Sequence, residues 1–143
     1  MAERTRRQFL KEAVVLGGSA LLVVGCSESL DVTQGVSVEL LLPEALRAPG
    51  GHYEITDPSI LAQFGERRTI FLYRSSESSV IAVSTRCTHQ GCRVVFSSMS
   101  QEFSCPCHGA RFQANGKVIR GSAKRDLFRY RATLLGDTVR IES

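Results

Sequence analysis

The sequence predicts a small all-β domain, built as an antiparallel sandwich or barrel. From residue 36 onward, segments of strand length are rich in β-branched and aromatic residues, and some alternate between apolar and polar side chains. Turn signals separate these segments, such as Asn115-Gly116 and the Gly-containing loop at 135–137. Only 43–48 and 58–64 look suited to a helical turn. Many short strands joined by Gly and Asn turns are typical of antiparallel all-β architectures.

The expected strands follow one another at short intervals along the chain. The first begins with the alternating residues 36–40, and Leu41 and Leu42 extend it. The Ser-rich run 75–79 is interpreted as a hairpin loop between two strands. The full set of expected strands is 36–42, 69–73, 80–83, 93–96, 117–119, 127–134 and 138–141.

Composition and charge favour one ordinary globular domain. The chain has 143 residues, of which 43% are hydrophobic and 22% charged. The net charge of +4 divides equally between the first 26 residues and the remainder, which is too weak a bias to predict a nucleic-acid-binding face. One basic group stands out, formed by Lys124, Arg125, Arg129 and Arg131. We interpret it as a solvated strand and turn, with docking of an acidic partner as the alternative.

The first 26 residues resemble a twin-arginine export signal. The run Thr5-Arg6-Arg7-Gln8-Phe9-Leu10-Lys11 has the paired arginines, and an apolar stretch follows at 13–25. A helix that spans a bilayer needs about 20 apolar residues, so the length favours a signal peptide over a membrane span. The alternative is a short amphipathic or anchoring helix. Twin-arginine export carries folded proteins, and it therefore suits a protein that receives its cofactor in the cytoplasm.

The end of this leader predicts how the chain is attached outside the cytoplasm. Residues 23–26, Val-Val-Gly-Cys, resemble a lipoprotein cleavage box, in which Cys26 becomes the acylated first residue. The alternative is an uncleaved anchor that leaves Cys26 without a role. We therefore expect a signal at 1–26, a flexible tether at 27–35 and the folded domain at 36–143. The domain is expected on the periplasmic side, anchored to the membrane by a lipid or by its signal.

Four cysteines and two histidines gather in two short motifs, Cys87-Thr88-His89-Gln90-Gly91-Cys92 and Cys105-Pro106-Cys107-His108-Gly109. Two thiolates can hold one iron of a 2Fe–2S pair while two neutral imidazoles hold the other, which raises the reduction potential. Gly91 and Gly109 allow the backbone to wrap closely around such a cluster, and its amide groups could then point at sulfide. Pro106 stiffens the second motif because its ring fixes a backbone angle.

Two other chemistries use the same residue types. One Cys-x-His and one Cys-x-x-His pair could supply a tetrahedral zinc site. A scaffold in which all four cysteines are bridged would leave the two histidines without a purpose. The flanking glycines, the additional cysteines and the export signal favour the iron–sulfur centre over both alternatives.

These motifs resemble the Rieske signature, in the disulfide-bearing branch found in cytochrome bc-type and b6f-type complexes and in arsenite oxidase small subunits. The resemblance implies a Rieske fold, a base sandwich with an inserted cluster-binding subdomain, and one 2Fe–2S cluster per chain. It implies that Cys92 and Cys107 form a disulfide. The implied cluster ligands are the thiolates of Cys87 and Cys105 and the imidazoles of His89 and His108.

The chain departs from the quinol-oxidising relatives at three places near the cluster. Ala110 and Phe112 occupy positions where those relatives often have Ser and Tyr, whose hydroxyls donate hydrogen bonds to sulfur. Losing those donors should lower the reduction potential within the Rieske range of about −150 to +300 mV. The segment 121–123, Gly-Ser-Ala, lacks the proline that the family often has there, so the loop beside the cluster should be less rigid.

The resemblance implies one-electron transfer between redox proteins, with quinol-linked or cytochrome-like donors and acceptors and no nucleic acid. The leading hypothesis is an electron carrier on the outer face of the cytoplasmic membrane, without a substrate site of its own. The alternative is a Rieske subunit of a multi-chain oxidoreductase, similar to quinol–cytochrome c reductase or to arsenite oxidase. A ferredoxin or oxygenase component of a ring-hydroxylating system fits less well. The remaining histidine, His52, is expected in a loop, as a surface or turn residue.

Overall fold

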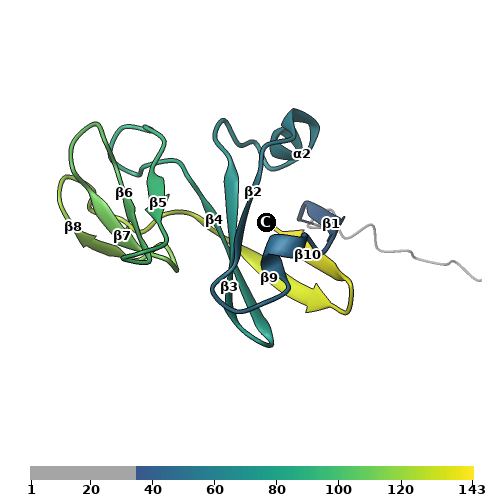
Figure 1. The fold of residues 1–143 in the computed structure, drawn as a ribbon. Helices are drawn as coiled ribbons and strands as arrows, with labels where there is room; N and C mark the ends of the chain where they lie inside the picture. Colours follow the sequence, from purple (N-terminus) through teal and green to yellow (C-terminus); the bar gives the residue numbers. More distant parts are fainter. Residues whose placement is uncertain (1–34) are drawn as a thin grey trace, which may run out of the picture. The chain divides into compact units, whose positions relative to one another are not determined.

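The structure is a computed structural model, and it describes residues 35–143 (Figure 1). The predicted export signal and all but the last residue of the predicted tether lie outside the described residues. The predicted all-β class is confirmed, since the secondary structure consists almost wholly of short strands. The elements are β1 (Ser37–Leu41), the 3-10 turn η1 (Glu44–Leu46), β2 (His52–Ile55), α2 (Pro58–Gln63), β3 (Ile70–Ser76), β4 (Ser79–Ser84), β5 (Val95–Ser97), β6 (Glu102–Ser104), β7 (Arg111–Gln113), β8 (Val118–Arg120), β9 (Arg129–Leu135) and β10 (Thr138–Glu142).

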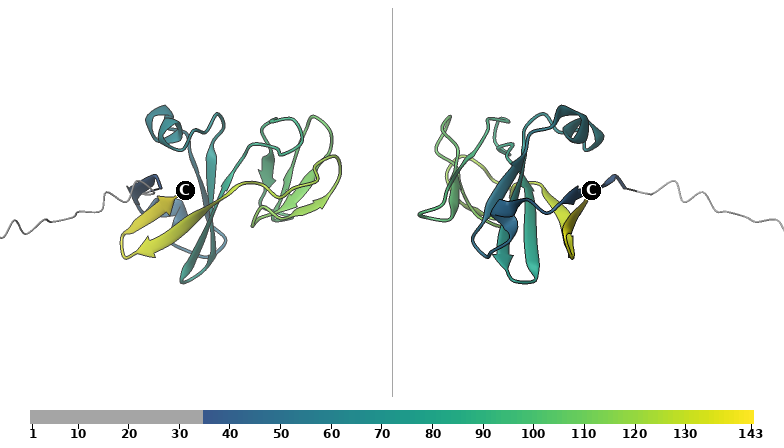
Figure 2. Two further views of the ribbon diagram at one scale, coloured as in Figure 1. Left: turned by 180° about the vertical axis from the view of Figure 1, so that it is seen from behind. Right: turned by 45° about the vertical axis from the view of Figure 1, so that its right-hand side comes forward.

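The strands form two antiparallel sheets. The larger sheet has the order β1-β10-β9-β4-β3-β2, and the smaller has the order β5-β6-β7-β8. Figures 1 and 2 show the smaller sheet to one side of the larger one. All of the smaller sheet lies between β4 and β9 in the sequence, yet β4 and β9 pair directly, with Ala82 opposite Tyr130 and Val83 opposite Arg129. The predicted insertion of a subdomain into the base domain is therefore confirmed.

Strand β3 is buried on both of its faces. Phe71 and Tyr73 belong to the core that is shared with the smaller sheet, whereas Ile70 and Leu72 belong to the core of the base domain. Successive side chains of a strand point to opposite faces, so this alternation places one β3 residue in each core in turn. A strand with two buried faces has a continuous apolar sequence, which explains the run Ile-Phe-Leu-Tyr at its start.

Aromatic side chains join the smaller sheet to β3. The ring of Phe71 lies 4.6 Å from that of Phe96 and 4.9 Å from that of Phe103, measured between centroids. Phe103 and Phe112 are fully buried and stand opposite each other on β6 and β7. Offset and edge-to-face aromatic pairs stabilise such a core beyond their buried area. This packing fixes the subdomain that carries both Cys/His motifs against the base sheet.

The two expected helical turns are present as η1 and α2. Pro58 occupies the first turn of α2, where its missing N–H costs nothing, and the carboxylate of Asp57 accepts a hydrogen bond from the amide of Ser59 at 2.8 Å. Both features are typical of a helix start. Among the described residues, no helix has the length and apolar character needed to cross a bilayer.

The expected loop around His52 is wrong. His52 lies in β2, opposite Tyr73 of β3, and its ring stacks on that of Phe71 with centroids 5.4 Å apart. Its side chain is exposed, as expected. The strand was not predicted because Gly50-Gly51 precedes it, and glycine pairs usually mark loops. The turn instead ends at Gly51, and the chain enters the sheet at once.

Candidate metal centre

The two Cys/His motifs form loops with the same backbone hydrogen bonds. The amide of Cys87 donates to the carbonyl of Cys92, and the amide of Cys105 donates to that of Ala110, each at 2.8 Å. In the reverse direction, the glycine four residues after each cysteine donates to that cysteine's carbonyl, at 2.8 Å from Gly91 and 3.0 Å from Gly109. The loops thus place Cys87 and Cys105 at equivalent positions. The same register makes Ala110 the counterpart of Cys92.

Glycine is required at the turn of each loop. Gly91 has φ +76° and Gly109 has φ +69°, in the left-handed region that side-chain-bearing residues rarely adopt. The amide groups of both glycines are used within the loops, since they donate to the cysteine carbonyls. These glycines therefore shape the loops through their backbone angles, and their own N–H groups already have carbonyl acceptors.

The structure brings the four residues expected as cluster ligands into two pairs. The thiols of Cys87 and Cys105 are buried and free, and burial, followed by the neighbouring Cys105, raises the pKa of the Cys87 thiol. His89 and His108 are exposed, and their rings meet edge to face with centroids 4.9 Å apart. Two buried sulfurs and two adjacent exposed imidazoles supply the donors that a Rieske 2Fe–2S cluster uses. The residues present therefore fit the cluster.

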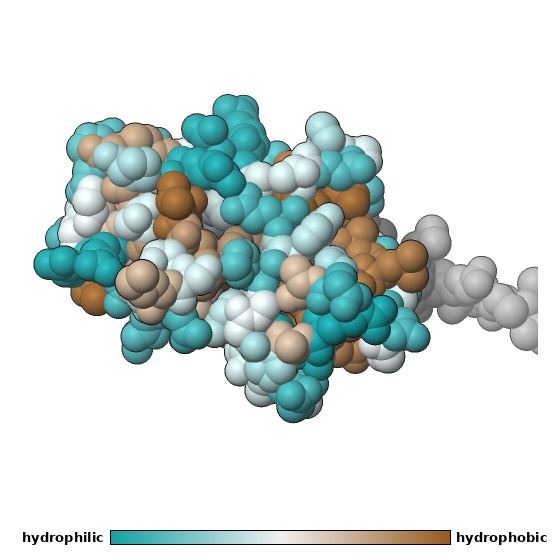
Figure 3. All heavy atoms as spheres, in the orientation of Figure 1, coloured by the Kyte–Doolittle hydropathy of each residue, from teal (hydrophilic) through white to brown (hydrophobic). Residues whose placement is uncertain are grey.

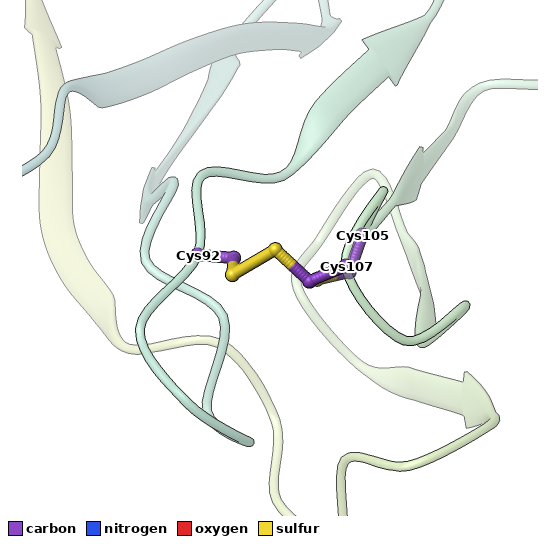
Figure 4. Close-up of side chains that lie close together, drawn as sticks. All are labelled: Cys92, Cys105 and Cys107. Carbon is purple, nitrogen blue, oxygen red and sulfur yellow. A yellow bond between two sulfur atoms is a disulfide. The ribbon is translucent and has the colours of Figure 1, made fainter.

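A disulfide joins the two loops. It links Cys92 to Cys107, across a sequence separation of 15 residues (Figure 4). The sulfur of Cys105 lies within 4.8 Å of both disulfide sulfurs, so the bridge lies directly beside one of the expected ligands. Because Cys87 and Cys105 remain free, the alternative in which all four cysteines are bridged is wrong.

A third segment packs against the second loop. Gly121 has φ +101°, and a Cβ built on it would lie 2.7 Å from both the Cα of Ala110 and the carbonyl oxygen of Gly109. The hydroxyl of Ser122 donates to the carbonyl of His108 at 3.3 Å. Glycine at 121 is thus needed for both its backbone angle and its lack of a side chain. Even without the proline that the family often has here, this segment contacts the loop directly.

The first loop is attached to the rest of the molecule by two contacts that the sequence did not predict. The hydroxyl of Thr88 donates to the carbonyl of Arg125 at 2.6 Å, and the Nε of Arg68 donates to the carbonyl of Gly91 at 3.2 Å. Both join residues more than 20 positions apart, and no local pattern signals such pairings. Each contact fixes the loop that carries Cys87 and His89.

The two positions that lack hydroxyls are fully buried. Ala110 and Phe112 are both 0% exposed and belong to the core shared by the two sheets. Ala110 ends the second loop, and Phe112 follows it in β7. Neither side chain carries a hydrogen-bond donor, so near this loop the protein supplies apolar contacts where a Ser and a Tyr would supply hydroxyl groups.

The fold and the site together define a class of small iron–sulfur proteins. The profile of the Rieske [2Fe-2S] domain family matches residues 55–131. This chain therefore belongs to the Rieske [2Fe-2S] domain family, and its cofactor is a 2Fe–2S cluster. Membership of this family also argues against the alternative of a tetrahedral zinc site on the two Cys/His motifs.

Individual relatives agree with this placement. The chain is 54% identical over 54 residues to a cytochrome b6-f complex iron-sulfur subunit of Synechococcus sp. (strain JA-3-3Ab), a match to 38% of this chain and 31% of the relative. The subunit of the same name from Chlorobaculum thiosulfatiphilum is 33% identical over 101 residues, or 71% of this chain and 51% of the relative. The matches thus span 31% and 51% of the length of these two curated relatives.

One solved structure resembles nearly the whole described domain. The crystal structure of the cyanobacterial plasma membrane Rieske protein PetC3 from Synechocystis PCC 6803 matches with a TM-score of 0.59 and 31% sequence identity. The match covers 74% of this chain and 99% of that one. The similarity confirms the Rieske fold.

Proposed function

We propose that this chain is an electron carrier on the outer face of the cytoplasmic membrane, with its cluster held by Cys87, Cys105, His89 and His108. The observation that carries the proposal is the pairing of two buried thiols with two adjacent exposed imidazoles on hydrogen-bonded loops of the same geometry. The arrangement separates the roles of the two pairs. The thiolates belong to the interior, and the imidazoles face the surface where a redox partner can approach.

When bound, the cluster supplies a site that accepts and releases one electron at a time. The chain's own residues determine access to it. The exposed rings of His89 and His108 provide the surface through which an electron enters and leaves, because the thiol side is covered by the core. The disulfide and the Gly121 segment support the second loop and hold its histidine in place.

The apolar surroundings of the second loop favour a potential in the lower part of the disulfide-bearing Rieske group. Hydrogen bonds to cluster sulfur stabilise the added electron and raise the potential. Ala110 and Phe112 cannot donate such bonds, and both side chains are buried. We therefore expect a lower reduction potential than in relatives that have Ser and Tyr at these two positions. A lower potential suits a relay between redox proteins better than direct oxidation of a high-potential quinol.

The attachment to the membrane follows from the N-terminal motifs. The twin-arginine run at 5–11 directs export of the folded, cofactor-loaded domain, and acylation of Cys26 leaves a lipid on the mature protein. The following residues 27–35 serve as a tether between lipid and domain. Mass spectrometry of the protein purified from membranes tests this step. A diacylated or triacylated Cys26 at the N-terminus supports it, and an intact leader contradicts it.

The alternative is a Rieske subunit of a multi-chain oxidoreductase. Two relatives that share sequence with this chain are cytochrome b6-f complex iron-sulfur subunits, which favours this second candidate. A redox titration of the purified chain distinguishes the two. A midpoint near the upper end of the Rieske range, about +300 mV, supports quinol oxidation in a complex, whereas a clearly lower midpoint supports the relay.

A further inference from the structure

Three arginines surround the loop that carries His89. The Nε of Arg68 donates to the carbonyl of Gly91, and the Nε of Arg86 lies 3.4 Å from the point where a Cβ of Gly91 would stand. The backbone carbonyl of Arg125 accepts a hydrogen bond from the hydroxyl of Thr88. The guanidinium group of Arg125 takes no part in this contact. All three residues are exposed, and none forms an ion pair with a carboxylate of residues 35–143.

The two loops differ in the charged side chains that they contain and contact. The second loop, 105–110, contains His108 but no Lys, Arg, Asp or Glu. The nearest arginine in sequence, Arg111, is paired with Glu102. Arg120 and Lys124 also carry charge beside the 121–123 segment that contacts the second loop. The first loop differs because an arginine side chain contacts it directly and two further arginines line the cavity at His89.

A cavity of about 500 Å³ opens beside the first loop. Its lining includes His89, Arg86 and Arg125, together with Phe128, which is 57% exposed. Glu66 is the one carboxylate of the lining. One of its oxygens accepts from the Tyr130 hydroxyl at 2.6 Å, and the other is shielded from solvent. The side of the cavity that a partner meets is therefore cationic, with an exposed aromatic ring at its edge.

Hydrophilic residues cover much of the molecular face seen in Figure 3, and hydrophobic residues form small separate patches there. This face therefore offers a partner mostly polar contacts. Unpaired guanidinium groups attract carboxylates over distances of about 10 Å at moderate salt. Exposed aromatic residues next to such charges commonly contribute to the centre of an interface.

We propose that an acidic one-electron acceptor protein docks over the His89 arginine surface, which we define as Arg68, Arg86, Arg125 and Phe128. The inference rests on the proposed function, because it assumes that electrons leave through the exposed imidazoles. One electron passes from the reduced chain to the oxidised metal centre of the partner, and no bond forms or breaks. Carboxylates of the partner lie against the arginines, and the electron leaves on the His89 side.

The test is a stopped-flow measurement of electron transfer from the reduced, cofactor-loaded full chain to two c-type cytochromes of similar potential, one acidic and one basic. At low ionic strength the acidic cytochrome should be reduced faster, and added salt should slow it. Arg125→Glu should slow the acidic cytochrome by a factor of about 3 to 10, because charges at the edge of an interface act mainly on the association rate. Arg125→Gln should give a smaller change in the same direction.

Arg131→Glu is the matched control. Arg131 is also exposed, but it lies within β9, opposite Glu142 of β10 in the base sheet. Arg131→Glu changes the net charge by the same amount as Arg125→Glu. Comparing the two variants therefore separates an effect of charge at the docking surface from an effect of the total charge. The proposal is overturned if the two charge reversals slow the acidic cytochrome equally, or if the basic cytochrome is the faster acceptor.

A second readout keeps this inference separate from the proposed function. The electron paramagnetic resonance spectrum and midpoint potential of Arg125→Glu should match those of the unsubstituted protein, because the contact with Thr88 uses the Arg125 backbone. A normal cluster without any preference for the acidic cytochrome overturns only the docking surface. Absence of the mixed Cys/His cluster in the unsubstituted chain overturns the proposed function itself.

Discussion

Gly121 lies directly against Ala110, at the end of the loop that carries Cys105 and His108. A Cβ on Gly121 would stand 2.7 Å from the Cα of Ala110, closer than real Cβ contacts allow, and its φ of +101° disfavours any side chain. The backbone of the 121–123 segment therefore supports the second loop at a distance that only glycine permits. The fit of the cluster loop depends on this contact as well as on the residues expected to bind iron.

Gly121→Ala should consequently destabilise both the domain and its cluster. The left-handed backbone alone costs about 1–2 kcal/mol for alanine, and the contact with Ala110 adds to this cost. Thermal unfolding, followed by the loss of visible absorbance, measures the effect. Gly136→Ala is the matched control, because Gly136 has φ +62° with no atom near its Cβ position. Equal losses in the two variants would show that the contact with Ala110 contributes nothing.

The double substitution Cys92→Ala with Cys107→Ala should lower the stability of the loops. Closing a loop of 15 residues is worth about 3 kcal/mol in the chain-entropy description of disulfides. We expect the cluster to bleach at lower urea concentration, and faster at any given concentration, than in the unsubstituted protein. Ser78→Ala, in the exposed turn between β3 and β4, serves as the control. Bleaching curves that coincide with those of the unsubstituted protein would show that the disulfide does not support the cluster.

Adding the missing hydroxyl at Ala110 should raise the midpoint potential. A hydrogen bond to a charged acceptor contributes about 1.5 kcal/mol, which corresponds to about 60 mV for a one-electron couple. Ala110→Ser should therefore raise the potential by up to about 60 mV, and adding Phe112→Tyr should raise it further. Phe103→Tyr, which introduces a hydroxyl on the neighbouring strand, is the control. A potential that stays unchanged in the double variant would refute the explanation based on missing donors.

Tyr130 predicts a loss of stability at alkaline pH. Its hydroxyl donates to Glu66 at 2.6 Å, and burial, followed by this carboxylate, raises the pKa of Tyr130 far above its usual range. Above pH 10 the unfolded chain loses the Tyr130 proton while the folded chain keeps it. Stability should therefore fall by up to about 1.4 kcal/mol per pH unit.

Urea unfolding at several pH values between about 9 and 11 measures this effect. Tyr130→Phe should reduce the slope of stability against pH, whereas Tyr53→Phe, at a side chain that is 41% exposed, should leave it nearly unchanged. An equal slope in Tyr130→Phe and the unsubstituted protein would rule out the linkage. Below pH 10 the contribution of Tyr130 to the free energy of unfolding does not change with pH. The difference in stability between Tyr130→Phe and the unsubstituted protein at about pH 9 therefore reports only the lost hydrogen bond.

Much of the fold follows from local sequence patterns. The long apolar or alternating strands β1, β3, β4, β9 and β10 were predicted, with ends that differ by a few residues at most. Strands β6 and β7 were missed because each has three residues with a single apolar one, Phe103 or Phe112. The equally short β5 and β8 were predicted in part because each begins with two consecutive apolar residues. Strand β2 was missed because Gly50-Gly51 precedes it and its pairing with β3 is a tertiary contact.

The candidate ligands can be read from the sequence, whereas the contacts that support their loops cannot. The two motifs carry the Rieske signature within 23 residues, so their chemistry is visible in the sequence. The contacts of Thr88 with Arg125 and of Arg68 with Gly91 connect distant segments, and only the folded chain shows them. The same holds for the cavity beside His89, because its lining comes from separate parts of the sequence.

The ligand set is the central claim, and pulsed electron paramagnetic resonance of the reduced, purified full chain tests it most directly. Two bound imidazoles should give nitrogen couplings from two histidines in the spectrum of a reduced 2Fe–2S pair. His89→Cys and His108→Cys should each remove one of these couplings or abolish the cluster. A colourless protein that contains zinc, or a 2Fe–2S signal without histidine nitrogen couplings, would contradict the assignment.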